Sequence, residues 1–384
     1  MRLLDASLAP DASPMTALAS PMPSLASPTP RSPAPGRARG PARVLDAPGL
    51  ADDWYATAIA LDDHGDTLAA ALGAGVYVYR VATTAAAALP PPSAPVTALA
   101  WAPGGACGRV LGMADARGGV CTADASGGRP PTRLARAHAR RAGAAAWADA
   151  GLLATGGRDR RIILHDARSP AGVGGVAAAH GGEVTGLAWR PSHAHALASS
   201  GADGGVRVWD MRNLAAGPAA EAGDRAGAAV KALAWSPAGA ALAAGGGSAD
   251  GTLRILTPTL RLRASAPAGG QVSGAAWRAD GGALATACGY GANAGAITLW
   301  TPTSDALSRG PTLPGGHSAR ALCLAGAGDA AASAGADETV RLWAPWGGGP
   351  GPPGSPHAPM ASACAGVRRG LFSLASPAPR AGLR

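Results

Sequence analysis

Short apolar runs that follow tight turns recur along the chain. In residues 335–343, a turn that carries Asp337 is followed by alternating apolar and polar positions as far as a closing Trp. Period-two alternation after a turn predicts a half-buried β-strand. The same arrangement of a turn with an Asp and a following apolar strand recurs at residues 157–165, 201–209 and 249–256. A repeated unit of this kind decides the architecture before any single residue does.

Two landmarks mark the repeat unit over most of the chain. One is an apolar strand that is often closed by Trp, and the other is a later strand. The later strands end near Tyr79, Ala123, His165, Trp209, Leu256, Trp300 and Trp343. Successive ends are 44, 42, 44, 47, 44 and 43 residues apart, a spacing typical of four-stranded propeller blades. The sequence therefore predicts an all-β fold, a seven-bladed WD40-type β-propeller.

The last repeat, residues 321–343, supplies only three strands. Because an incomplete last blade would leave open strand edges, we expect residues 44–48 to add the fourth strand and close the ring. Closure would bring Asp52, Asp53 and Glu338 near one another, and carboxylates that flank a groove bind an Arg side chain through charge-assisted hydrogen bonds. The alternative is that Glu338 is only part of a turn between two strands.

Composition separates the propeller, residues 44–346, from two tails. Residues 1–43 are rich in Ser, Pro and Arg, and residues 347–384 are rich in Gly and Pro, so both are expected to be disordered. Five Ser and Thr residues of the first tail stand directly before Pro and are candidate sites for a proline-directed kinase: Ser13, Ser20, Ser27, Thr29 and Ser32. The tail is either regulated by phosphorylation at these positions or is simply a linker of ordinary composition.

The apolar share of the chain is 47%, yet aromatic residues make up only 4%. Ala carries most of that share, so the core is expected to depend on the ten Trp residues and on backbone pairing. The net charge of +9 comes almost wholly from Arg, with Lys231 as the single Lys. No basic block alternates with aromatic residues as in a single-strand binding surface, so we expect neither nucleic acid nor membrane as a partner.

The sequence nominates no catalytic set, metal or cofactor. It contains no G-x-S-x-G, phosphate-binding loop or H-E-x-x-H motif. Its five Cys residues lack C-x-x-C spacing, which favours neither a disulfide framework nor zinc and suggests a reducing compartment. Each of His138, His180 and His317 precedes the first strand of a different repeat, which favours a structural role over a shared metal.

Several segments resemble the Fizzy and Fizzy-related proteins, which are substrate-recruiting activators of the anaphase-promoting complex, a ubiquitin ligase. The most specific are Val44-Leu45-Asp46-Ala47-Pro48 and residues 336–343, and residues 30–33, 53–55 and 316–320 agree as well. The match continues through residues 165–168, 183–187, 230–235, 245–247, 271–272 and 289–291. The resemblance covers about residues 30–346.

The resemblance implies a non-catalytic adaptor that binds two kinds of degron. A destruction box of the Arg-x-x-Leu type would lie between the first and last blades, with its Arg held by Asp53 and Glu338 beside Asp52. A Lys-Glu-Asn degron would lie on the top face, where Arg320 and Ser248 match the family's positions. Ala202 and Ala294 stand where the family has polar residues, which weakens the match at this second site.

The resemblance also implies partners: subunits of the anaphase-promoting complex and cell-cycle proteins such as cyclins, in the nucleus and cytoplasm. Leu383 and Arg384 are a conservative version of the family's C-terminal Ile-Arg docking pair. Residues 1–43 hold no counterpart of the family's Asp-Arg-(Phe/Tyr)-Ile-Pro-x-Arg docking box, so this start is either truncated or divergent. The competing hypothesis is a propeller scaffold of another pathway, such as trafficking or RNA processing.

Overall fold

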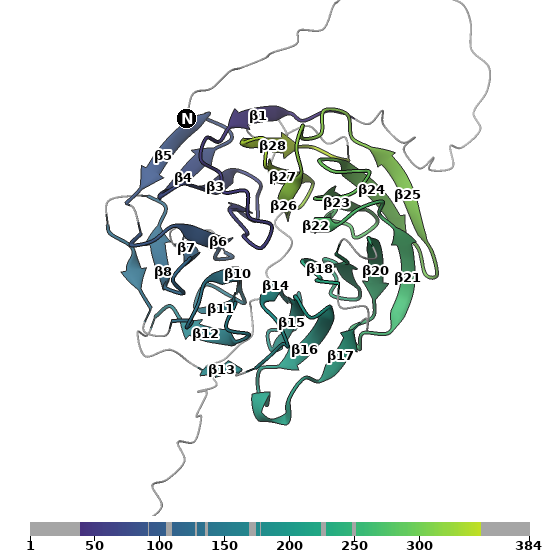
Figure 1. The fold of residues 1–384 in the computed structure, drawn as a ribbon, viewed down its shortest axis with the longest axis horizontal. Helices are drawn as coiled ribbons and strands as arrows, with labels where there is room; N and C mark the ends of the chain where they lie inside the picture. Colours follow the sequence, from purple (N-terminus) through teal and green to yellow (C-terminus); the bar gives the residue numbers. More distant parts are fainter. Residues whose placement is uncertain are drawn as a thin grey trace, which may run out of the picture. The chain divides into compact units, whose positions relative to one another are not determined.

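The computed structural model describes residues 39–346, except 91, 105–109, 127–128, 135–136, 169–173, 177, 224–227 and 248–250. Seven antiparallel sheets of four strands each form within this part and surround a common centre (Figure 1). The predicted all-β, seven-bladed propeller is therefore confirmed. The segments expected to be disordered tails lie almost wholly outside the described residues.

Each of the first six blades is a meander that runs from an inner to an outer strand. In chain order these strands are β2 (Ile59–Leu61), β3 (Thr67–Leu72), β4 (Gly75–Arg80), β5 (Ala85–Leu89); β6 (Val96–Trp101), β7 (Val110–Asp115), β8 (Val120–Asp124), β9 (Thr132–Arg133); β10 (Ala142–Trp147), β11 (Leu152–Gly157), β12 (Ile162–Asp166), β13 (Gly174–Val176); β14 (Val184–Trp189), β15 (Ala196–Gly201), β16 (Gly205–Asp210), β17 (Ala220–Gly223); β18 (Ala232–Trp235), β19 (Leu242–Gly245), β20 (Thr252–Leu256), β21 (Leu262–Pro267); and β22 (Val272–Trp277), β23 (Leu284–Cys288), β24 (Ile297–Pro302), β25 (Leu307–Thr312). The 3-10 helix η1 (Leu214–Ala216) lies between β16 and β17.

The seventh blade joins the two ends of the propeller. It consists of β26 (Ala321–Ala327), β27 (Ala330–Gly335), β28 (Thr339–Trp343) and, on the outside, β1 (Arg43–Asp46) from the start of the described chain. β1 runs antiparallel to β28 and pairs Leu45 with Val340 and Asp46 with Thr339. Since β26 also contacts β2, the ring is closed as the sequence predicts.

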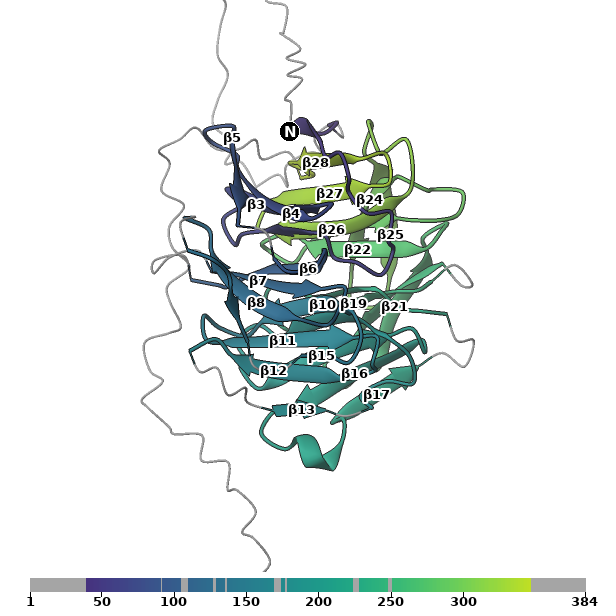
Figure 2. The ribbon, with the colours of Figure 1, turned by 60° about the vertical axis from the view of Figure 1, so that its left-hand side comes forward.

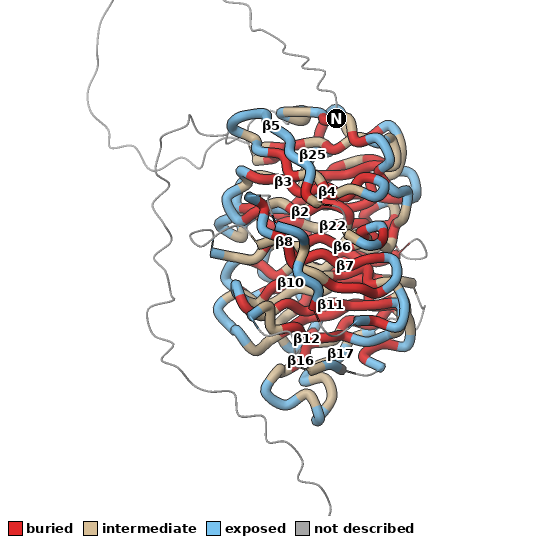
Figure 3. Tube along the Cα trace, turned by 90° about the vertical axis from the view of Figure 1, so that its left-hand side faces the viewer, coloured by how far each residue is buried: buried red, intermediate tan, exposed pale blue. Residues whose placement is uncertain are grey.

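Buried positions follow the strands, whereas exposed positions gather at the turns and along outer strands such as β5 (Figure 3; Figure 2 shows the strands as ribbons). Many of the buried side chains are Ala, so specific contacts must hold adjacent blades together. The Trp that closes an inner strand makes such a contact, because its Nε1 donates to a carbonyl in the inner strand of the preceding blade. The pairs, at 3.0–3.1 Å, are Trp101–Ala60, Trp147–Ala100, Trp189–Ala146, Trp235–Ala188 and Trp277–Ala234.

This ladder of indole hydrogen bonds gives a stability prediction. Trp189→Phe removes the donor to Ala146 and leaves a carbonyl unpaired, so the free energy of unfolding should fall by about 1–3 kcal/mol. Trp346→Phe is the matched control, because the Nε1 of Trp346 is buried without a hydrogen-bond partner among the described residues. Urea unfolding of both variants checks the difference, and equal losses would contradict a role for the ladder.

The three His residues with a predicted structural role are confirmed in it. In each, Nδ1 contacts an Asp carboxylate at 2.8–3.0 Å and Nε2 contacts a hydroxyl at 2.7–2.9 Å; the sets are His138 with Asp159 and Thr155, His180 with Asp203 and Ser199, and His317 with Asp337 and Ser333. Burial raises the pKa of Asp337, but the Thr339 hydroxyl and His317 lower it further, to about 2. These groups fix the turns that lead into the blades.

The described residues contain no cluster of three or more His, Cys, Asp or Glu side chains placed to hold a metal ion. A search of the same residues for a long, apolar helix able to cross a bilayer also finds none. Neither finding concerns the remaining parts of the chain.

Candidate functional site

The segment between β1 and β2 runs inward from the rim to the centre of the ring (Figure 1). We call residues 51–56 the axial loop. Asp53 folds this loop back on itself, because its Oδ1 accepts the backbone N–H of Tyr55 at 2.9 Å and its carbonyl accepts that of Ala56 at 3.1 Å. Asp side chains favour such local turns over regular strand pairing. The loop therefore brings residues 52–55 to the centre of the ring, where Asp52 is exposed, Asp53 and Tyr55 are half-buried and Trp54 is buried.

Lys231 anchors the loop from the fifth blade. Its Nζ donates to the carbonyl of Ala56 at 2.9 Å and to that of Leu322, in β26, at 2.6 Å, and it lies 5.6 Å from the ring centre of Trp54. Lys231 directly precedes β18, whose inner-strand neighbours are β14 and β22, so these contacts bridge blades that are not adjacent. Only 5% of Lys231 is exposed, and this burial lowers the pKa of its ammonium group to about 8.

The depressed pKa of Lys231 predicts a pH dependence. The value in the unfolded chain is 10.5, so between about pH 8 and 10.5 the unfolded state binds more protons than the folded state, and folding becomes more favourable as the pH rises through this window. The slope is at most about 1.4 kcal/mol per pH unit. Urea unfolding of the wild type and of Lys231→Met at several pH values isolates this contribution, since groups that the substitution leaves unaffected cancel in the difference. Parallel pH profiles would contradict it.

Arg141 holds the side of the loop that faces the third and fourth blades. Its Nη1 donates to Oδ2 of Asp53 at 2.6 Å, and its Nε and Nη2 form a fork with both carboxylate oxygens of Glu183 at 2.8 and 2.9 Å. The guanidinium also lies 5.1 Å from the ring centre of Tyr55. The carboxylates of Asp53 and Glu183 are thus both engaged by one cation.

Arg320 holds the opposite side of the loop, from the seventh blade. Its Nε donates to Oδ1 of Asp52 at 2.6 Å and its Nη2 to the carbonyl of the same residue at 3.0 Å. The guanidinium stacks on Tyr290 at 4.4 Å from the ring centre. Tyr290 is 46% exposed and Asp52 is exposed as well, so an acid, a cation and an aromatic ring lie together at the surface.

The structure divides the three predicted acidic residues between two places. Asp52 and Asp53 lie in the axial loop, with Arg320 and Arg141 as partners. Glu338 is exposed in the turn between β27 and β28, where its carbonyl accepts the N–H of Ala47 at 2.8 Å. No hydrogen bond joins Glu338 to Asp52 or Asp53 among the described residues, so the shared cleft stays a prediction.

The sequence analysis missed Asp46, the acidic residue that the backbone places beside Glu338. Asp46 ends β1 and pairs with Thr339, the residue that follows Glu338. The expected pairing of residues 44–48 with the last blade could have identified Asp46 as a neighbour of Glu338. The predicted positions Ser248, Leu383 and Arg384, and the five candidate phosphorylation sites, lie outside the described residues.

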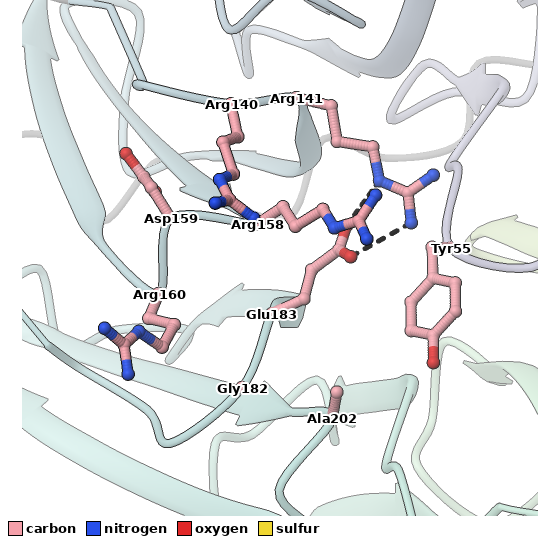
Figure 4. A pocket seen from close by; sticks show the side chains of 9 residues that line it. All are labelled: Tyr55, Arg140, Arg141, Arg158, Asp159, Arg160, Gly182, Glu183 and Ala202. Atoms are coloured by element: carbon pink, nitrogen blue, oxygen red, sulfur yellow. Dashed lines mark hydrogen bonds and ion pairs between the residues drawn. The ribbon is translucent and has the colours of Figure 1, made fainter.

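A second feature that the sequence analysis did not identify is an open hollow of about 670 Å³ beside the axial loop, between the third and fourth blades. Its wall includes Tyr55 and the Arg141–Glu183 pair (Figure 4). Three further arginines, Arg140, Arg158 and Arg160, line the same hollow. Ala202, which stands at or beside a polar position of the family, lies in its wall too.

Comparison with known proteins gives consistent matches. The family model described as WD domain, G-beta repeat matches residues 175–210 and 223–256. "Cell division cycle 20.5, cofactor of APC complex" from Arabidopsis thaliana is 34% identical over 322 residues, which cover 80% of this chain and 68% of that relative. "Protein FIZZY-RELATED 3" from the same plant is 33% identical over 309 residues, covering 79% of this chain and 61% of the relative.

Two further matches come from a yeast protein and a solved structure. "WD repeat-containing protein srw1" from Schizosaccharomyces pombe is 35% identical over 311 residues, covering 79% of this chain, and the chain spans about half (53%) of that relative. A chain in a crystal structure of the mitotic checkpoint complex superposes with a TM-score of 0.73 at 30% identity, covering 83% of this chain and 96% of that one.

Proposed function

The chain belongs to the family of cell division cycle 20 and Fizzy-related WD-repeat proteins, and on that premise we propose that it is a non-catalytic adaptor that brings degron-bearing cell-cycle proteins to the anaphase-promoting complex. The observation that carries this proposal is the alignment of 322 residues with a relative named as a cofactor of that complex. The alignment covers 80% of the chain, and the described part of the chain is a closed propeller.

Two surfaces suit the two kinds of degron. The corner of Asp46 and Glu338, where β1 meets the last blade, places two acidic residues next to each other in the backbone, and it would hold the Arg of an Arg-x-x-Leu segment. Carboxylates bind a guanidinium through charge-assisted, often paired hydrogen bonds. Sequence reasoning paired Asp53 with Glu338 as the holders of this Arg. The carboxylate of Asp53 is engaged by Arg141, so Asp46 takes its place beside Glu338 in this proposal.

The surface of Asp52, Arg320 and Tyr290 would take a Lys-Glu-Asn degron. That peptide carries a cation and an anion on adjacent residues, and this surface presents one carboxylate and one guanidinium within 2.6 Å of each other. A bound peptide would exchange the internal pair for two intermolecular ones. The exposed ring of Tyr290 adds apolar area beside the charges.

Co-purification tests the proposal against its alternative. The tagged full chain, expressed in dividing eukaryotic cells, should recover subunits of the anaphase-promoting complex, and the recovered complex should contain a destruction-box protein such as a cyclin. Recovery of trafficking or RNA-processing subunits in place of the ligase would contradict the proposal and support a scaffold of another pathway.

A further inference from the structure

The turns between the second and third strands share one geometry in four blades. In each turn, the N–H of a residue with positive φ donates to the carbonyl three positions earlier at 3.0–3.2 Å. These residues are Gly118 (φ 87°), Arg160 (φ 68°), Gly204 (φ 76°) and Glu338 (φ 53°). Glycine adopts this left-handed region freely, whereas a residue with a Cβ is strained there.

Two of the four turns therefore keep a charged residue where glycine would be more stable. Strain of this kind persists at positions that bind or react. Glu338 belongs to the acidic corner proposed above to bind the destruction box. Arg160 is the equivalent residue in the third blade, and it has no role in the function proposed so far.

Arg160 lies in the Arg-lined hollow with Arg140 and Arg158 (Figure 4). All three are exposed, and none of their side chains has a hydrogen bond or ion pair among the described residues. The two acids of the same wall are already engaged. Asp159 accepts from His138 and from the N–H of Ala139 at 2.9 and 3.0 Å, and Glu183 is held by Arg141. The hollow therefore presents three uncompensated guanidinium groups.

We propose that Arg140, Arg158 and Arg160 form a binding site for clustered anionic groups, either a phosphorylated residue or a run of Asp and Glu, on a peptide. The planar fork of a guanidinium matches the oxygens of phosphate and carboxylate. This site lies beside the axial loop, so it would bind an acidic segment that lies next to a degron in the same peptide. In that respect it rests on the proposed function, since the peptide belongs to a recruited substrate.

The geometry favours a peptide over a nucleic acid. Single-stranded nucleic acid is bound along a charged track with aromatic rings on which bases stack. The aromatic side chain that lines this hollow is Tyr55, and Arg141 already covers its ring. The charges are also confined to one hollow of about 670 Å³, which suits one or two anionic side chains.

Fluorescence anisotropy with short labelled peptides tests the site directly on the full chain. The probes are a nine-residue peptide with one phosphothreonine between glutamates, the same peptide with Glu in place of the phosphothreonine, and an uncharged version. We expect the first two to bind and the third not to, with affinity that falls as salt rises. Arg158→Ala and Arg160→Gly should each weaken binding about tenfold.

Arg160→Gly separates binding from folding, because it removes the guanidinium and relieves the strained φ. Its melting temperature should not fall.

Arg161→Ala is the matched control, since it removes the same charge from the same turn at a residue outside the hollow, and it should bind like the wild type. Equal weakening in Arg161→Ala, no binding of either acidic peptide, or tighter binding of a single-stranded RNA of similar charge would each overturn the site. None of these results depends on recovery of the ligase or on degron binding, so failure here leaves the proposed function to its own test.

Discussion

Leu45→Ala is expected to lower the free energy of unfolding by about 2–5 kcal/mol, the range for truncating a fully buried Leu. Leu45 is 2% exposed in β1, pairs with Val340 and packs in the core cluster shared by the first and last blades. Loss of its side chain weakens the one strand that closes the ring. Because the other blades pair within themselves, no other strand can replace it.

Val44→Ala is the matched control for this effect. Val44 is the preceding residue of the same strand, is 40% exposed and has the same pairing partner strand, so its truncation should cost less than about 0.5 kcal/mol. Urea unfolding followed by Trp fluorescence measures both variants. Similar losses in the two would mean that closure does not depend on the core face of β1.

Glu338→Gly is expected to weaken the binding of an Arg-x-x-Leu peptide by about 2–5 kcal/mol, which is at least about 30-fold. The variant removes one of the two carboxylates at the corner with Asp46 and leaves the Arg of the peptide without it. Glycine also suits the left-handed φ of 53° at this position, so the folded state should be at least as stable. A loss of affinity in a protein of undiminished stability would locate the effect in the carboxylate.

The architecture could be predicted from local pattern. The strand spacing, the Trp residues and the Asp-bearing turns are all visible over a few residues. The closing strand followed from counting strands in the last repeat, and the structure bears that out with β1 against β28. These features depend on strand period and on strand pairing, which a sequence displays directly.

The site could not be predicted to the same depth, because its contacts join residues far apart in the chain. Asp53 and Arg141 are 88 positions apart, and Lys231 reaches the carbonyl of Ala56 across 175 positions. Which acidic residue meets which Arg depends on the path of the axial loop across the centre of the ring. Sequence reasoning grouped Asp53 with Glu338 from the expected closure of the ring and from the family resemblance, and it did not consider Asp46.

Arg160 shows a further limit of prediction from sequence. Its sequence neighbourhood indicates a turn, but the left-handed backbone and the absence of a partner within the described residues are properties of the folded chain. An Arg in a basic, Arg-rich protein carries no signal by itself. Its position in a strained turn at the edge of a hollow is what distinguishes it from the other surface arginines.

Direct titration of the full chain with a labelled Arg-x-x-Leu peptide, beside the same peptide with both positions changed to Ala, tests the account most directly. We predict saturable binding of the first peptide, at least tenfold weaker binding of the second, and release of the first by an unlabelled destruction-box segment of a cyclin. Equal binding of the two peptides, or none at all by a folded protein, would contradict the claim that this propeller recognises degrons.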